Sequence, residues 1–170
     1  REAVGVLVKV LQDLKQEPMV RHEAAEALGA IGSPEVIPVL KTYLQDPVIE
    51  VAETCELALG RIKWLQDSPN IELSSNPYVS VDPTPPAEST DIQNLKTVLY
   101  DENAPLFDRY RAMFSLRNMR TDEAVLILSQ ALNKGSALYR HEVAFVLGQL
   151  QHKLSIPFLK AALEDEEQNE

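Results

Sequence analysis

Cysteine is almost absent from this 170-residue sequence, and long apolar runs are absent altogether. The single Cys55 cannot form an internal disulfide, and no apolar run is long enough to span a bilayer or to act as a secretory signal. These absences exclude a disulfide-stapled secreted scaffold and argue against a membrane protein. We therefore expect a soluble protein of a reducing compartment, namely the cytoplasm.

Basic residues, glycines and aromatic residues are also scarce. Sixteen lysines and arginines face 26 aspartates and glutamates, which gives a formal net charge of −10. This charge disfavours binding to nucleic acid or to an anionic membrane and favours a basic partner or a cation. Only six glycines accompany a 45% hydrophobic content that is mostly Ala, Val, Leu and Ile. Such a composition favours an all-α fold over a sandwich or a barrel.

An internal repeat is the strongest pattern in the sequence. Residues 20–46 align without a gap on residues 139–165, an offset of 119, with twelve identities in 27 positions. A shorter period of 31 residues relates 20–31 to 51–62 and 108–119 to 139–150. A recurring unit about two helices long is typical of HEAT or armadillo helical hairpins, although these are usually longer. We predict an α-solenoid of HEAT-like hairpins.

Residues 67–90 interrupt the repeats. They hold five of the eleven prolines and show no periodicity, which is typical of a linker. We predict an N-terminal HEAT-like lobe at residues 1–66 and a C-terminal one at 91–170. Residues 1–13 resemble the second helix of a unit whose first helix is missing, so we expect an excerpt of a longer protein. Exposed terminal repeats would also let two copies pair as a homodimer.

One tripeptide occurs twice at the same position of its unit. The two copies are Arg21-His22-Glu23 and Arg140-His141-Glu142. The apolar stripe expected to be buried in the first copy consists of Val20, Ala24, Ala27, Leu28 and Ile31. At about 100° per residue, His22 lies opposite this stripe, and His141 lies opposite its own. We therefore expect both histidines to face away from the core.

Small residues follow each histidine at one and two turns. They are Ala25 and Gly29 after His22, and Ala144 and Gly148 after His141. Glycine inside a helix is unfavourable relative to alanine, so its recurrence indicates a need for close approach by another helix or by a ligand.

Adjacent His and Glu side chains point about 100° apart, so they cannot easily chelate one ion, but they can serve two neighbouring ions. If the lobes face each other, nitrogen and oxygen ligands would meet in a set that suits non-haem iron. The structural alternative is a pair of surface histidines inherited with the repeat. The other two units carry Glu53-Thr54 and Tyr110-Arg111 at the equivalent positions, so only two of the four units keep the motif.

Other candidate residues have structural interpretations. We expect Arg21 and Arg140 to pair with carboxylates on neighbouring helices, the alternative being that they orient the histidines. His152 falls at a helix break, which favours a solvent-facing or capping role, and Cys55 falls on an apolar face, which favours the core. We expect Tyr100, Tyr110 and Tyr139 to be packing residues.

Several stretches resemble the deoxyhypusine hydroxylase family, and together they cover nearly the whole chain. They include EPMVRHEAAEALGAIGSPEVIPVLK, DPVIEVAETCELA, PYVSVDPTPPAE, FDRYRAMFSLRN and GSALYRHEVAFVLGQLQH. The resemblance implies a HEAT-like, two-lobed monooxygenase with two iron ions. Such an enzyme uses dioxygen to hydroxylate the deoxyhypusine side chain of a translation initiation factor.

The family uses four His-Glu motifs, two in each lobe. By position, the resemblance implies that His22 and His141 are iron ligands, and that Glu23 and Glu142 either bind iron or receive the substrate amine as catalytic residues. Only two of the four motifs occur here, so we expect the chain alone to be an incomplete catalyst. The competing interpretation is a non-catalytic HEAT-repeat scaffold that binds a protein partner. A repeat protein similar to phycobilin lyases is a third and weaker candidate.

Overall fold

Two compact units make up the chain in the computed structural model, which describes residues 2–68 and 76–165. Of these residues, unit 1 holds 2–68 and 81–85, and unit 2 holds 76–80 and 86–165. No strand occurs in the two described ranges, which confirms the prediction of an all-α chain. Residues 69–75 of the predicted linker lie outside the described residues. The lobe boundaries at 66 and 91 stay predictions.

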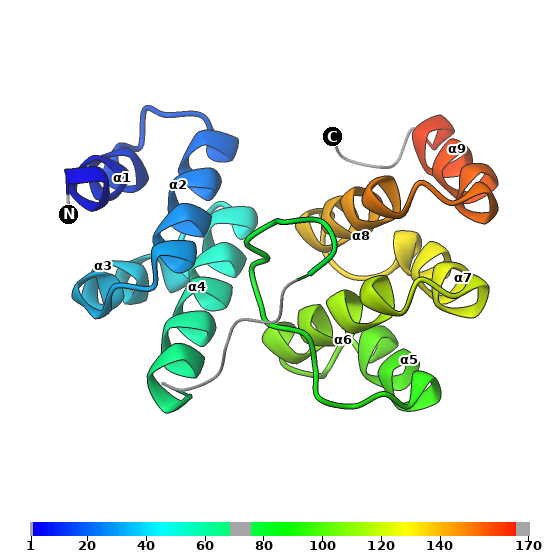
Figure 1. The fold of residues 1–170 in the computed structure, drawn as a ribbon. Helices are drawn as coiled ribbons and strands as arrows, with labels where there is room; N and C mark the ends of the chain where they lie inside the picture. The colour runs from blue at the N-terminus through cyan, green and yellow to red at the C-terminus, as the bar shows by residue number, and fades with distance from the viewer. Residues whose placement is uncertain (1, 69–75, 166–170) are drawn as a thin grey trace. The chain divides into compact units, whose positions relative to one another are not determined.

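Unit 1 is a pair of helical layers. Its helices are α1 (Glu2–Gln12), α2 (Pro18–Ile31), α3 (Ile37–Thr42) and α4 (Ile49–Asp67), and short 3₁₀ turns flank α3 as η1 (Pro34–Val36) and η2 (Tyr43–Gln45). α2 packs against both α1 and α4, and α3 packs against α4. Figure 1 shows α2 and α4 side by side, with α1 and α3 together on one side of this pair.

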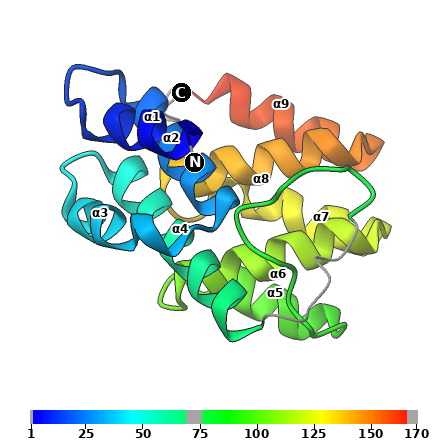
Figure 2. The same ribbon diagram turned by 60° about the vertical axis from the view of Figure 1, so that its left-hand side comes forward.

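Unit 2 has the same kind of alternation between two helical layers. Its helices are α5 (Ile92–Tyr100), α6 (Leu106–Met119), α7 (Asp122–Gln130), α8 (Ala137–Leu150) and α9 (Ile156–Glu164), with 3₁₀ turns η3 (Ala131–Asn133) and η4 (Lys153–Ser155). α6 packs against α8, and α7 packs against α6, α8 and α9. α5, α7 and α9 therefore form one layer, and α6 and α8 form the other. The turned view of Figure 2 shows the helices of unit 2 following one another in chain order from α5 to α9.

The helix boundaries reproduce the sequence repeat. α8 begins and ends 119 residues after α2, and α6 begins and ends 31 residues before α8. The residue after each of these helices adopts the left-handed conformation, with φ of 71° at Gly32, 55° at Arg120 and 49° at Gln151. The turn geometry is thus kept even where glycine, the residue that adopts it most easily, has been replaced.

The core of unit 1 lies between its two layers. It consists of Leu11, Ala24, Ala25, Leu28, Val36, Leu40, Val51, Cys55, Ala58 and Ile62. Cys55 is fully buried, as the sequence predicts. Burial raises the pKa of its thiol to about 12. Because the thiolate is the reactive form, this cysteine is a packing residue rather than a nucleophile.

Residues 76–90 of the predicted linker contain no helix and are divided between the two units. In unit 1, the Arg61 guanidinium donates a hydrogen bond to the Asp82 carbonyl oxygen at 2.8 Å. In unit 2, the Ser115 hydroxyl donates to the Ala87 carbonyl oxygen at 3.1 Å. Residues 76–90 are therefore fixed by specific hydrogen bonds, unlike a freely moving tether.

Candidate metal centre

His22 lies on a face of α2 that is covered by neighbouring helices. Its side chain is 6% exposed, so the prediction that it faces away from the core is wrong. The residues buried along α2 are Arg21, His22, Ala24, Ala25, Leu28 and Gly29. Val20 and Ile31 of the predicted stripe are exposed instead. Because α2 packs against both α1 and α4, it buries a wider arc than a single apolar stripe describes.

Thr54 of α4 holds one edge of the His22 ring. The Nδ1 atom of His22 lies 2.6 Å from the Thr54 Oγ1 atom in a buried contact. The Thr54 hydroxyl also donates to the Glu50 carbonyl oxygen, one turn earlier, at 2.7 Å. Sequence reasoning missed this contact. The only available signal was the 31-residue period, which places Thr54 at the position that Glu23 occupies one unit earlier.

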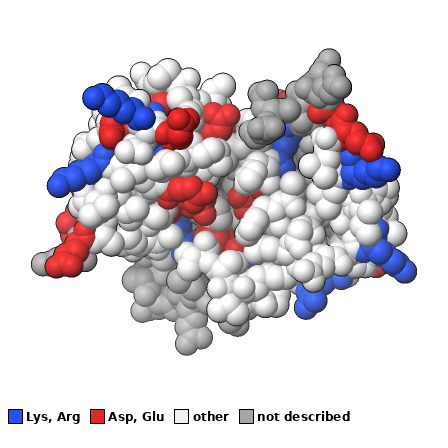
Figure 3. Space-filling view, turned by 90° about the horizontal axis from the view of Figure 1, so that it is seen from above, with Lys and Arg blue, Asp and Glu red and all other residues white. Residues whose placement is uncertain are grey.

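Two carboxylates face the other edge of the ring. The His22 Nε2 atom lies 3.9 Å from the Glu23 Oε1 atom and 3.8 Å from the Glu26 Oε2 atom. Burial raises the pKa of Glu26, and the negative charges of Glu23 and Asp82 raise it further. Sequence reasoning missed Glu26 and Asp82. Figure 3 shows acidic side chains gathered in groups on one face of the molecule. This edge of His22 therefore favours a cation.

Arg21 anchors the start of α2. Its Nε atom donates to the Leu11 carbonyl oxygen at 3.0 Å, and its two terminal nitrogens donate to the two carboxylate oxygens of Asp46. Burial by itself would raise the pKa of Asp46, but the hydrogen bonds from Arg21 and from the Val48 backbone, with the charge of Arg21, lower it overall. The ion pair predicted for Arg21 is confirmed.

The second motif lies on α8 with the opposite pattern of exposure. The Ser136 hydroxyl caps the helix by accepting from the Tyr139 backbone N–H. Arg140 donates to the Gly135 carbonyl oxygen at 2.7 Å. His141 is exposed, which confirms the prediction for this histidine, whereas Glu142 is only 9% exposed.

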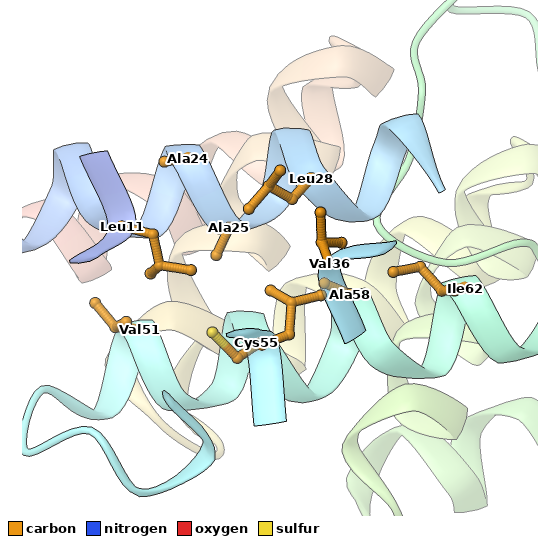
Figure 4. Close-up of a cluster of buried hydrophobic side chains, with 10 residues drawn as sticks. Leu11, Ala24, Ala25, Leu28, Val36, Val51, Cys55, Ala58 and Ile62 are labelled. Carbon is orange, nitrogen blue, oxygen red and sulfur yellow. The ribbon is translucent and has the colours of Figure 1, made fainter. Parts of the chain in front are cut away.

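The glycines that follow the two histidines also differ. A Cβ atom at Gly29 would lie 2.8 Å from both the Cα and the Cβ atoms of Ala58, so α4 approaches α2 at a distance that only glycine allows. Figure 4 shows Ala58 on α4 on the side of that helix that faces α2. A Cβ atom at Gly148 would meet no atom within 4 Å. The close approach predicted from the small residues is confirmed at Gly29, and the described residues contain none at Gly148.

Within each unit, the described residues bring possible metal-ligating side chains close together but do not form a complete metal site. Among residues 2–68 and 76–165, no group of three or more His, Cys, Asp or Glu side chains is placed to hold a metal ion. Unit 1 brings His22 together with Glu23 and Glu26, and unit 2 supplies His141 and Glu142. An imidazole nitrogen beside carboxylate oxygens fits the ligand preference of non-haem iron. The metal-ligand roles of these residues stay predictions.

The remaining candidates are structural. His152 precedes η4, where its Nδ1 atom accepts from the Leu154 backbone N–H at 3.3 Å, so the capping role is confirmed. Tyr110 and Tyr139 are buried and pack edge to face with ring centroids 5.6 Å apart. Tyr100 is half-buried and donates to the Ile127 carbonyl oxygen. None of the three tyrosines departs from the predicted packing role.

Two family models match the repeats. The model for HEAT repeats covers residues 1–60, and the model for the PBS lyase HEAT-like repeat covers residues 108–134 and 139–165. Fold and family models together define the class: this is a HEAT-like helical repeat protein, as the 31-residue period predicts. Within the described residues, no helix has the length and apolar character needed to cross a membrane.

Curated deoxyhypusine hydroxylases are similar to the chain over nearly its whole length. The Drosophila melanogaster protein is 59% identical over 99% of this chain and 56% of its own length. The Homo sapiens protein is 61% identical over 95% of this chain and 53% of its own length. A solved structure of human deoxyhypusine hydroxylase in complex with glycerol gives a TM-score of 0.94 at 58% identity, covering 99% of this chain and 58% of that one.

These comparisons confirm the resemblance to the deoxyhypusine hydroxylase family seen in the sequence. The chain spans about half the length of the curated relatives it matches.

Proposed function

We propose that this chain forms part of a deoxyhypusine hydroxylase, an enzyme that hydroxylates the deoxyhypusine side chain of a translation initiation factor to form hypusine. The observation that carries the proposal is the 59% identity to a curated deoxyhypusine hydroxylase over 99% of the chain, a span that includes both His-Glu motifs. The co-substrate is dioxygen, and the cofactor is a non-haem di-iron centre.

The ligands proposed for the centre are His22 and His141, with Glu23 and Glu142 as carboxylate ligands or as acceptors of the substrate amine. Iron bound there would supply the activation of dioxygen. The role of the protein would be to hold the ligating side chains in position. The buried position of His22 restricts its ring, whereas the Glu23 side chain is 69% exposed and therefore accessible to a cationic side chain of the substrate.

The acidic character of this surface supports a cationic substrate. Glu23 and Glu26 lie beside His22, and the charge of Asp82 contributes to the raised pKa of Glu26. Deoxyhypusine carries a long amine-bearing side chain, which carboxylates would attract and orient. The net charge of −10 extends the same preference to the whole chain.

Two His-Glu motifs supply half the ligands of the proposed centre, so the chain alone would bind iron weakly or with the help of a second chain. Pairing of two copies through their terminal repeats is one way to supply the rest. This homodimer, the cytoplasmic location and the lack of nucleic-acid or membrane binding stay predictions.

Iron binding gives the test of this function. Anaerobic loading of the chain with Fe(II), followed by elemental analysis and visible absorption, is expected to show bound iron that His22→Ala/His141→Ala loses, with helix content unchanged by circular dichroism. His152→Ala is the matched control, because this third histidine caps η4 and should leave iron binding unchanged. Mass spectrometry of a deoxyhypusine-containing factor, incubated with the loaded chain and dioxygen, tests separately for catalysis, and the incomplete chain is expected to add no oxygen atom.

A scaffold without catalysis, in which the HEAT-like repeats bind a protein partner, is the alternative function. A scaffold predicts no specific iron in the wild-type chain, or iron that the double variant retains. Either result would remove the metal centre from this chain.

A further inference from the structure

The Thr54 hydroxyl sits between two partners that together fix its proton. Its oxygen lies 2.7 Å from the Glu50 carbonyl oxygen and 2.6 Å from the His22 Nδ1 atom. A carbonyl oxygen can only accept a hydrogen bond, and a threonine hydroxyl has one proton to give. The proton therefore points to Glu50, which leaves the hydroxyl oxygen to accept a hydrogen bond from His22.

This assignment decides which nitrogen of His22 carries hydrogen. If the Thr54 oxygen accepts, the Nδ1 atom must be protonated, and in the neutral ring the Nε2 atom then holds the lone pair. The Nε2 atom is the one that faces Glu23 and Glu26, at 3.9 and 3.8 Å. The nitrogen suited to ligation thus points to the side of the ring where the carboxylates lie.

The packing of α2 on α4 holds this hydrogen bond in place. Gly29 lies two turns after His22, and Ala58 lies one turn after Thr54. The contact between these two small residues lets the helices approach until threonine, a short side chain, reaches the imidazole. Both Thr54 and His22 are at least 95% buried, so water does not compete for the bond.

We propose that Thr54 is a positioning residue that fixes His22 as its Nδ1–H tautomer and directs the Nε2 lone pair toward the proposed metal centre. The significance for iron rests on the proposed function, while the tautomer itself does not. Residues that orient a ligating histidine in this way typically affect metal affinity by about 10–100-fold. Thr54 has no place among the His-Glu motifs and would act only through His22.

Long-range ¹H–¹⁵N correlation spectra of the histidine rings test the proposal in the metal-free chain, above the pH at which the ring is protonated. We expect the wild-type His22 ring to be the Nδ1–H tautomer. Thr54→Val, which keeps the shape and removes the hydroxyl, should abolish this preference, and Thr54→Ser should restore it. The variants His141→Ala and His152→Ala assign the signals of the three rings.

Thr42→Val is the matched control, because Thr42 donates the same kind of bond to the carbonyl oxygen one turn earlier, at Pro38, in an exposed position without a histidine. It should leave the His22 spectrum unchanged. A wild-type ring protonated at Nε2, or a Thr54→Val ring that keeps the wild-type tautomer, would overturn the proposal. The first of these outcomes needs no variant to fold.

The iron readout separates this proposal from the proposed function. Fe(II) affinity should fall by about 10–100-fold in Thr54→Val and recover in Thr54→Ser. If the wild-type chain binds no iron, the proposed function fails for this chain, and the ring spectra still decide whether Thr54 fixes the tautomer. Iron affinity unchanged in Thr54→Val would contradict the link from Thr54 to ligation.

Discussion

Arg21→Met is expected to destabilise unit 1 by about 3–5 kcal/mol, because removing one partner of a buried ion pair leaves the other charge without compensation. The Asp46 side chain is 2% exposed and receives both terminal nitrogens of Arg21. Methionine keeps the length and apolar character of the side chain and removes its charge and donors. Urea denaturation measures the loss, and hydrogen exchange along α2 assigns it to unit 1.

Arg109→Met is the matched control for this variant. Arg109 makes the same bond in α6, from its Nε atom to the Leu99 carbonyl oxygen at 3.3 Å, but its guanidinium stacks on the Tyr139 ring at 4.0 Å instead of meeting a carboxylate. Removing the Arg109 guanidinium leaves no carboxylate buried without a partner. Arg109→Met should therefore destabilise unit 2 by less than Arg21→Met destabilises unit 1. Equal losses in the two variants would show that the charge of Asp46 is not what makes Arg21 important.

The pH dependence of the Arg21→Met effect follows from the direction of the Asp46 pKa shift. In the wild type the folded-state pKa is lowered, so the pair stabilises the protein above the unfolded value of about 3.9 and loses this contribution as the pH falls through the folded value. In Arg21→Met, burial is expected to raise the pKa of Asp46, so protonation favours the folded state. The difference in unfolding free energy between the two proteins should therefore shrink as the pH falls from 7 toward 3. A pH-independent difference would exclude this mechanism.

Gly29→Ala is expected to destabilise unit 1 by about 1–3 kcal/mol, the usual range for overpacking a tightly packed core. The added Cβ atom would lie 2.8 Å from the Cα and Cβ atoms of Ala58, and a backbone atom cannot move aside as a side chain does. The helices would have to separate, which should also lengthen the bond between His22 and Thr54. Thermal unfolding measures the first effect, and the His22 ring spectrum measures the second.

Gly148→Ala provides the opposite expectation at the equivalent position of α8. Open space surrounds this glycine, and alanine is the better helix former, so the variant should be up to about 1 kcal/mol more stable. Opposite signs at Gly29 and Gly148 would show that contact with α4, and not helix propensity, governs the first site. A stabilised Gly29→Ala would contradict the close approach of α2 and α4.

The helical repeat was predictable from the sequence because similar segments recur at fixed offsets. Offsets of 119 and 31 residues predicted the spacing of α2, α6 and α8. The cap at His152 and the core position of Cys55 followed from local context in the same way. Gly29 was also informative, because glycine inside a helix is unfavourable relative to alanine and close packing is one reason to keep it.

The environment of His22 was not predictable in this way. The helical projection finds one apolar stripe, but α2 has neighbours on two sides and covers polar residues as well as apolar ones. A hydrogen bond between His22 and Thr54, 32 residues apart, depends on the register of two packed helices, and a single sequence does not contain that register. Asp46 was missed as the partner of Arg21 for the same reason, although a carboxylate partner was expected.

The course of the chain between α4 and α5 affects how separable the two halves are. The described chain leaves unit 1 after α4, contributes 76–80 to unit 2, returns to unit 1 with 81–85, and enters unit 2 again at 86. No single cut in 76–90 releases both halves with all the segments that pack against them. A cut between two units of an ordinary repeat array leaves each half with its own segments, whereas a single cut within 76–90 would remove from one half a segment that belongs to it.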